Sequence, residues 1–232
     1  MRILNLTDYF FPFVHGGAET SIFEMAKALS RRKHPVFILT PNYGSLADET
    51  IDGVVIHRYP FLTKLSPPSS QLTTAWHFNP IYWITVSLEL INAVHRHKVD
   101  IIHCQSATTV IPGVVAGKLL GIPTVVTFRD NQVLCNYGFC LTNNQFGKTC
   151  NLLDYFIKDF RHYYNEKIEN KNLLSILIQL FFACQGRVRA KSLRFFAHLC
   201  DARIVSSSAQ KKTFKANGFP DTQVISNIYH FP

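Results

Sequence analysis

The sequence predicts an α/β fold built on an open, mostly parallel sheet with helices on both faces. Two observations carry this prediction. Short apolar runs with little polar alternation, which are typical of strands buried on both sides, recur along the chain. Longer segments whose apolar residues repeat with helical spacing lie between these runs. Strands that alternate with helices in this way form parallel sheets with right-handed crossovers.

Each predicted element follows from the local spacing of apolar residues and from the Pro, Gly and Ser residues at its ends. The strands are short and mostly apolar, and we expect them at 3–7, 36–40, 54–59, 99–103, 124–128, 202–205 and 223–225. The helices have apolar residues three and four apart, and we expect them at 22–33, 81–97, 111–120, 152–199 and 206–218. Pro35, the Asp52-Gly53 turn and Gly218 separate elements, and Ser206 to Ser208 offer N-caps.

The regular pattern fails between residues 131 and 150, where we expect a long loop. This loop carries Cys135, Cys140 and Cys150, whose spacing lacks the C-x-x-C pairs of zinc sites, so idle thiols are favoured over metal ligands. We predict no metal and no cofactor. The six cysteines in a chain without an export signal at its N-terminus favour a reducing compartment, and we expect the protein in the cytoplasm.

Composition excludes some classes of protein but does not identify the function. The chain has 232 residues, of which 47% are hydrophobic and 17% charged, which excludes a disordered or coiled-coil protein. The 24 basic residues against 15 acidic ones give a formal charge of +9, which attracts phosphates, nucleic acid or an anionic membrane. No base-reading motif is present, so nucleic acid is not expected as a partner.

Ligands of open parallel sheets bind beyond the carboxyl ends of the strands, which predicts three candidate segments. The first is 8–19, where Gly16 and Gly17 precede a helix whose amino terminus attracts anions. The others are 103–106 and 129–131. Plainer interpretations stay open for each: ordinary turn geometry for the glycines, a packed strand-end residue for His103, and a local ion pair for Arg129 and Asp130.

The segment 173–184 is apolar and is followed by Arg187, Arg189, Lys191 and Arg194. It is too short to cross a membrane. The combination suits an element in the headgroup layer of an anionic leaflet, and a helix packed in the core is an equal alternative. The glycine turn does not match G-x-G-x-x-G, so a nicotinamide-binding protein is disfavoured.

Taken in order, four stretches resemble the N-terminal domain of family 4 glycosyltransferases with the GT-B fold. They are the opening strand with Gly16-Gly17-Ala18-Glu19, the strand Asp100-Ile101-Ile102-His103, the segment from Gly121 to Asp130, and the segment from Asp201 to Ser208. The resemblance runs over nearly the whole chain. It implies a Rossmann-like half of the fold that binds the acceptor, while a second domain holds the nucleotide-sugar.

The resemblance also implies retaining transfer without a metal, from a nucleotide-sugar to a glycan or lipid-linked acceptor. On this basis we expect the acceptor-binding domain at 1–225, with a helical insertion at about 152–199, and the start of a hinge at 226–232. No E-x7-E pair of the donor domain is present, so we expect no sugar transfer by this chain alone. The alternative is a non-catalytic binding or scaffold module that pairs with a separate donor subunit.

The site residues follow from these expectations. Arg129 and Asp130 are the expected catalytic residues, and the expected substrate-binding residues are Gly16, Gly17, Glu19, His103 and Asn131. The family's cleft turn commonly has His-Asp where this chain has Arg129-Asp130, and an arginine cannot accept a proton. Stabilisation of phosphate charge is therefore the favoured role of Arg129. We expect the basic, apolar helical region to hold the domain at the cytoplasmic face of an anionic membrane.

Overall fold

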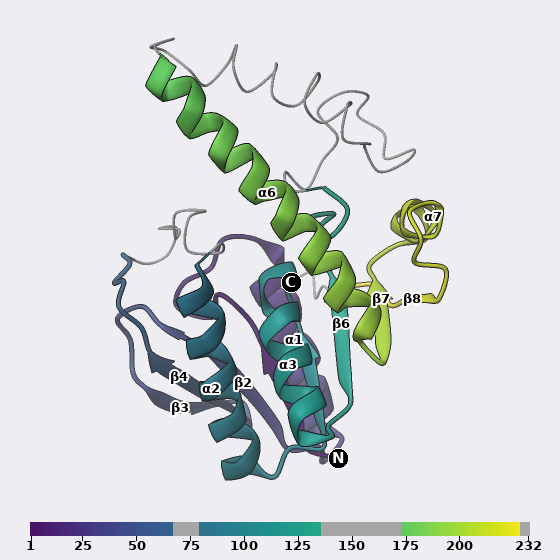
Figure 1. The fold of residues 1–232 in the computed structure, drawn as a ribbon. Helices are drawn as coiled ribbons and strands as arrows, with labels where there is room; N and C mark the ends of the chain where they lie inside the picture. Colours follow the sequence, from purple (N-terminus) through teal and green to yellow (C-terminus); the bar gives the residue numbers. More distant parts are fainter. Residues whose placement is uncertain (67–78, 136–172, 228–232) are drawn as a thin grey trace.

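The computed structural model describes residues 1–66, 79–135 and 173–227, which form one sheet with helices on both faces (Figure 1). The strands are β1 (Ile3–Leu6), β2 (Val36–Asn42), β3 (Asp48–Ile51), β4 (Val54–Pro60), β5 (Ile101–Cys104), β6 (Thr124–Phe128), β7 (Ala202–Val205) and β8 (Thr222–Val224). The helices are α1 (Gly17–Arg31), α2 (Pro80–His97), α3 (Val110–Leu120), α6 (Leu173–Leu199) and α7 (Ser208–Ala216), with a 3-10 turn η2 (Ala107–Thr109) before α3.

The sheet order is β3-β4-β2-β1-β5-β6-β7-β8, and every pair is parallel except β3 with β4. The predicted fold class is therefore confirmed. Strand β3 was not predicted: it is a four-residue edge strand that pairs back onto β4 across the predicted Asp52-Gly53 turn. Its alternating exposed and half-buried residues, two of them acidic, lack the apolar signal of a buried strand.

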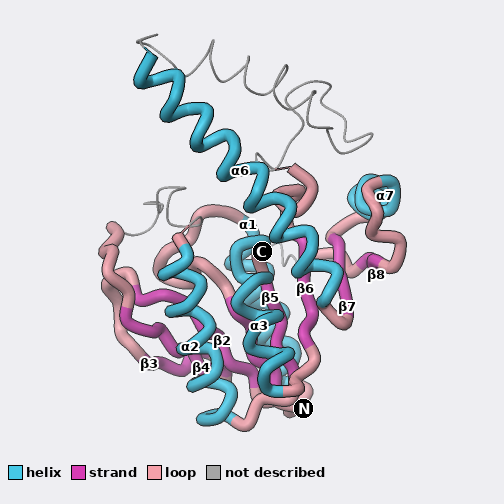
Figure 2. Tube along the Cα trace, in the orientation of Figure 1, coloured by secondary structure: helices cyan, strands magenta, loops and turns pink. Residues whose placement is uncertain are grey.

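Helices cover the two faces unequally. One core cluster lies between the sheet and α1, and includes Ile22, Ile38 and Ile56. The larger cluster lies on the other face, where α2, α3 and α6 run side by side in front of the sheet (Figure 2). Alternation along β1 sends Leu4 and Leu6 into this larger cluster.

Helix α3 approaches the sheet closely because two of its residues have no side chain. A Cβ atom on Gly113 would lie 2.2 Å from Sγ of Cys104, and one on Gly117 would lie 2.2 Å from Oγ1 of Thr124. The helix ends at Gly121, whose φ of +68° is the left-handed conformation that glycine adopts at little cost.

Several predicted features fall partly outside the described residues. Of the predicted helical insertion, the structure describes 173–199 as one helix, and 152–172 lie outside. Of the predicted loop, only 131–135 are described, so Cys140 and Cys150 lie outside as well. Within the described ranges, no helix is both long and apolar enough to span a membrane.

Candidate functional site

The carboxyl ends of the central strands carry polar side chains that meet at one edge of the sheet. Asp8 follows β1, Gln105 and Ser106 follow β5, and Arg129 and Asp130 follow β6. Because these strands are parallel neighbours, their carboxyl ends lie side by side. The amino terminus of α1 lies at the same edge because it follows β1.

Arg129 is held by two amide side chains. Its Nη2 donates to Oε1 of Gln105 at 2.7 Å, and its Nη1 donates to Oδ1 of Asn227 at 3.1 Å. Gln105 in turn donates to Oδ1 of Asn5 at 2.7 Å, and Oγ of Ser21 in α1 donates to the same Asn227 oxygen at 3.3 Å. The guanidinium is therefore fixed between β6 and α1 at the predicted edge.

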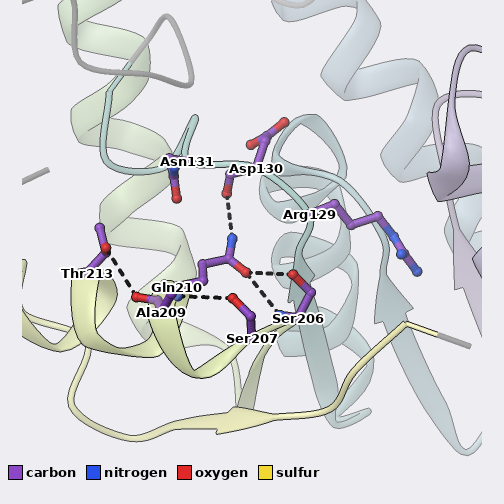
Figure 3. A pocket seen from close by; sticks show the side chains of 8 residues that line it. All are labelled: Arg129, Asp130, Asn131, Ser206, Ser207, Ala209, Gln210 and Thr213. Carbon is purple, nitrogen blue, oxygen red and sulfur yellow. Dashed lines mark hydrogen bonds between the residues drawn. The ribbon is translucent and has the colours of Figure 1, made fainter. Parts of the chain in front are cut away.

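Asp130 and Asn131 border a shallow pocket of about 320 Å³, whose lining also includes Arg129, Ser206, Gln210 and Thr213. Figure 3 shows Arg129 pointing away from this group. Consecutive residues after a strand alternate in direction, so the predicted pair is separated although its members are neighbours in sequence.

Gln210 organises the floor of this pocket. Its Nε2 donates to the carbonyl oxygen of Asp130 at 3.3 Å, and its Oε1 accepts from the backbone N–H of Ser206 at 2.9 Å (Figure 3). Oδ1 of Asn131 is buried and has no hydrogen-bond donor among the described residues. A buried acceptor without a donor fits a ligand hydroxyl.

The carboxylate of Asp130 is exposed and accepts the backbone N–H of Gln132 at 2.8 Å. The chain around it still removes water from part of the carboxyl, and this desolvation raises its pKa; the Gln132 hydrogen bond and the charge of Arg189 oppose the rise. Arg189 belongs to α6, is buried, and donates to Oε1 of Gln132 at 3.0 Å. Arg189 was predicted among the membrane-facing cations, and this assignment is wrong because its side chain is buried and hydrogen-bonded to Gln132.

His103 lies within the sheet. It is 9% exposed, and its Nε2 is 2.7 Å from Oγ1 of Thr127. Burial, with a further contribution from the charge of Arg129, lowers the pKa of His103 to about 3. The imidazole is therefore neutral near pH 7, and its visible contact is a packed strand-end hydrogen bond.

The glycine turn forms the exposed amino terminus of α1. The N–H of Gly16 donates to Oε2 of Glu19 at 3.2 Å, so the buried Glu19 side chain is committed to capping the helix. Gly16 has an extended backbone (φ −176°), and a Cβ there would meet nothing within 4 Å. Neither strain nor crowding therefore explains this glycine, and the space over it is open.

Two contributors to this edge, Asp8 and His15, lie in the predicted segment 8–19 but were not predicted as site residues. Asp8 is buried, and its carboxylate accepts hydrogen bonds from Tyr82 at 2.8 Å, from Ser106 at 2.8 Å, and from Thr108. The ring of His15 packs edge-on against Tyr9, and neither of its nitrogens has a hydrogen-bond partner among the described residues. The role of Asp8 could not be derived from the sequence, because its hydroxyl partners lie 74 to 100 residues away.

No metal cluster supplements these side chains in the described part of the chain: nowhere in it do three His, Cys, Asp or Glu side chains gather. The structure leaves the three cysteines of the predicted loop untested, since only Cys135 is described.

A sequence model of the glycosyl transferase 4-like domain matches residues 16–227. The chain belongs to the glycosyl transferase 4-like family. Among curated relatives, it is 28% identical over 147 residues to one of the subunits of the human phosphatidylinositol N-acetylglucosaminyltransferase, covering 61% of this chain and 28% of the relative. It is also 28% identical over 115 residues to an uncharacterized protein in the cps region of Klebsiella pneumoniae, covering 46% of this chain and 30% of that protein.

Solved structures agree on the fold. HepE of Anabaena in complex with UDP has a TM-score of 0.52 and 15% identity, over 99% of this chain and 44% of HepE. Sucrose-phosphate synthase from Thermosynechococcus elongatus has a TM-score of 0.52 and 12% identity, over 97% of this chain and 47% of the synthase. This glycosyl transferase 4-like chain is thus an α/β, Rossmann-like half of a GT-B fold. It spans less than half the length of these relatives.

Proposed function

We propose that this chain is the acceptor-binding domain of a retaining glycosyltransferase. The enzyme moves a sugar from a nucleotide-sugar to a glycan or lipid-linked acceptor at the cytoplasmic face of a membrane. The observation that carries the proposal is that Arg129 is linked to the first turns of α1: Arg129 and Ser21 of α1 both donate a hydrogen bond to Oδ1 of Asn227. A cation and a helix amino terminus at one edge suit a diphosphate, which gains negative charge as the sugar leaves.

The pocket beside Asp130 and Asn131 has the chemistry of the acceptor. Its polar oxygens, including the unsatisfied Oδ1 of Asn131, match sugar hydroxyl donors. The Asp130 carboxylate then orients the attacking hydroxyl, and Arg189 holds its loop through Gln132. Neutral His103 supports Thr127 beneath Arg129 and does not take part in proton transfer.

The test measures release of nucleoside diphosphate from UDP-glucose and UDP-N-acetylglucosamine, with a membrane lipid extract as acceptor. The complete protein should release UDP only when the extract is present, and the Asp130→Asn variant should do so more slowly. Lipid-dependent release that is identical in both would contradict the role of Asp130 in acceptor binding.

A second candidate is a binding module that lacks catalysis and pairs with a separate donor subunit. It is favoured by the curated relative, whose name describes one component of an N-acetylglucosaminyltransferase. The 232-residue chain should then bind lipid extract without turnover until the partner is added. Turnover by the isolated chain would exclude this candidate.

A further inference from the structure

One side chain of α7 holds the turn that follows β6. The amide nitrogen Nε2 of Gln210 donates to the carbonyl oxygen of Phe128 at 3.2 Å and to the carbonyl oxygen of Asp130 at 3.3 Å. Figure 3 shows the second of these hydrogen bonds. The two carbonyls belong to the peptide groups on either side of the pair Arg129 and Asp130. Gln210 therefore restrains the backbone before and after the two proposed site residues.

The orientation of the Gln210 carboxamide is determined by its partners. Its Oε1 accepts from the backbone N–H of Ser206 at 2.9 Å and from Oγ of Ser206 at 3.0 Å. A backbone N–H can only donate, so the atom that faces it is the oxygen of the carboxamide. The two carbonyls of the turn can only accept, so the atom that faces them is the nitrogen. A flipped carboxamide would lose hydrogen bonds on both sides.

Helix α7 is itself anchored on the end of β6. The backbone N–H of Gln210 donates to Oγ of the N-cap residue Ser207 at 3.1 Å, which fixes the first turn of the helix. One turn later, the buried ring of Phe214 stacks on Phe128 with 4.6 Å between the ring centroids. Residues four apart share one face of a helix, so Gln210 and Phe214 both contact the last residue of β6. The side chain that restrains the turn therefore projects from a fixed base.

We propose that Gln210 is a positioning residue for sugar transfer, which acts on the substrates through the turn that carries Arg129 and Asp130. The inference rests on the proposed function and adds a residue to it. Gln105 and Asn227 hold the tip of the Arg129 side chain, whereas Gln210 holds the backbone from which it extends. Both restraints together keep the guanidinium near α1 while Asp130 lines the acceptor pocket. A turn freed from Gln210 misplaces both groups, and a displacement of about 1 Å can cost about 100-fold in rate.

The variant Gln210→Glu of the complete protein tests the proposal. A glutamate still accepts from Ser206, but it presents an oxygen instead of a donor nitrogen to the two carbonyls. The kcat of UDP release with lipid extract as acceptor should fall about 10- to 100-fold. The KM for UDP-glucose should stay close to that of the wild type, because the amino terminus of α1 stays in place.

Two further variants separate the lost donor from the added charge. Gln210→Met removes the same donor without adding a charge, and its kcat should fall by a similar factor. Gln223→Glu is the matched control: Gln223 is exposed on β8, so the same chemical change there should leave kcat and KM unchanged.

Backbone NMR of the substrate-free protein provides a measurement that does not depend on activity. In Gln210→Glu, the amide signals of Arg129, Asp130 and Asn131 should shift and their hydrogen exchange should become faster, relative to wild type and to Gln223→Glu. If these signals change but the wild type releases no UDP, the proposed function fails and the positioning of the turn by Gln210 stands.

Three results would overturn the proposal. Turn signals that are unchanged in Gln210→Glu would show that Gln210 does not position the turn. Changed signals with an unchanged kcat would show that the position of the turn does not matter for transfer. A drop in thermal midpoint that accounts for the lost activity of both Gln210 variants would assign the residue to stability alone.

Discussion

Nη2 of Arg129 donates a 2.7 Å hydrogen bond to Oε1 of Gln105. The bond joins the ends of β6 and β5, and Gln105 extends the connection to β1 through Asn5. Three strands thereby hold one guanidinium in place at the edge where α1 begins. An arginine held in this way is preorganised, which is what the proposed contact with a diphosphate requires.

Replacing Arg129 with Gln should lower kcat about 100-fold, the usual cost of losing one preorganised group that stabilises developing charge. Arg129→Lys keeps the charge but loses the bidentate hydrogen bonding of the guanidinium. Its kcat should therefore lie between those of Arg129→Gln and the wild type. UDP release with lipid extract as acceptor measures both. Equal rates for Arg129→Gln and wild type would contradict the role.

Gly16→Ala should leave stability unchanged, because the new Cβ meets open space and the backbone is extended. It should nevertheless weaken binding of a UDP-sugar if the open space over α1 holds the diphosphate, and Gly16→Asp should weaken binding further by adding negative charge. Gly113→Ala is the opposite case: its Cβ collides with Cys104, so we expect a loss of about 1–3 kcal/mol in stability. Thermal melting and calorimetric titration with UDP-glucose separate the two effects.

Stability should fall on acidification through His103. Its pKa is about 3 in the folded protein and about 6.5 when unfolded, so the unfolded state binds the extra proton between these values. Each pH unit below 6.5 should therefore cost about 1.4 kcal/mol from this residue until pH 3 is approached. Urea unfolding of wild type and His103→Gln at pH 7 and pH 5 measures the difference. Parallel losses in both proteins would show that His103 contributes nothing.

Asp8→Asn should destabilise the protein by about 1–3 kcal/mol, because three hydroxyl donors lose a buried carboxylate acceptor. Asp130→Asn is the matched comparison, since Asp130 is exposed and an Asn side chain can still accept the backbone N–H of Gln132. Its urea midpoint should stay close to that of wild type. A larger decrease in the urea midpoint for Asp130→Asn than for Asp8→Asn would contradict the assignment of the structural role to Asp8.

The sequence predicted the helices and the seven parallel strands because burial on both faces leaves continuous apolar runs that local pattern detects. Strand β3 was not predicted, because an edge strand that contains Asp48 and Glu49 has no continuous apolar run. Periodicity also identified α6 as a helix without showing which face packs. Arg189 therefore seemed equivalent to Lys191, although the structure buries one and exposes the other.

The sequence predicted which edge of the sheet holds the candidate site, but not how the side chains at that edge are arranged. Strand ends and the glycine turn marked the edge, because topology alone determines where the carboxyl ends of parallel strands meet. The hydroxyl partners of Asp8 come from α2 and the segment after β5, and long-range contacts of this kind leave no local signal. The separation of Arg129 from Asp130 depended on side-chain direction, which spacing does not report.

Backbone and side-chain NMR of the complete protein during titration with UDP-glucose tests the central claim most directly. The account predicts that the amide signals of Gly16 and Gly17 and the guanidinium signal of Arg129 shift together and saturate at one ligand concentration. Saturable shifts confined to other parts of the sheet, with these three signals unchanged, would contradict it.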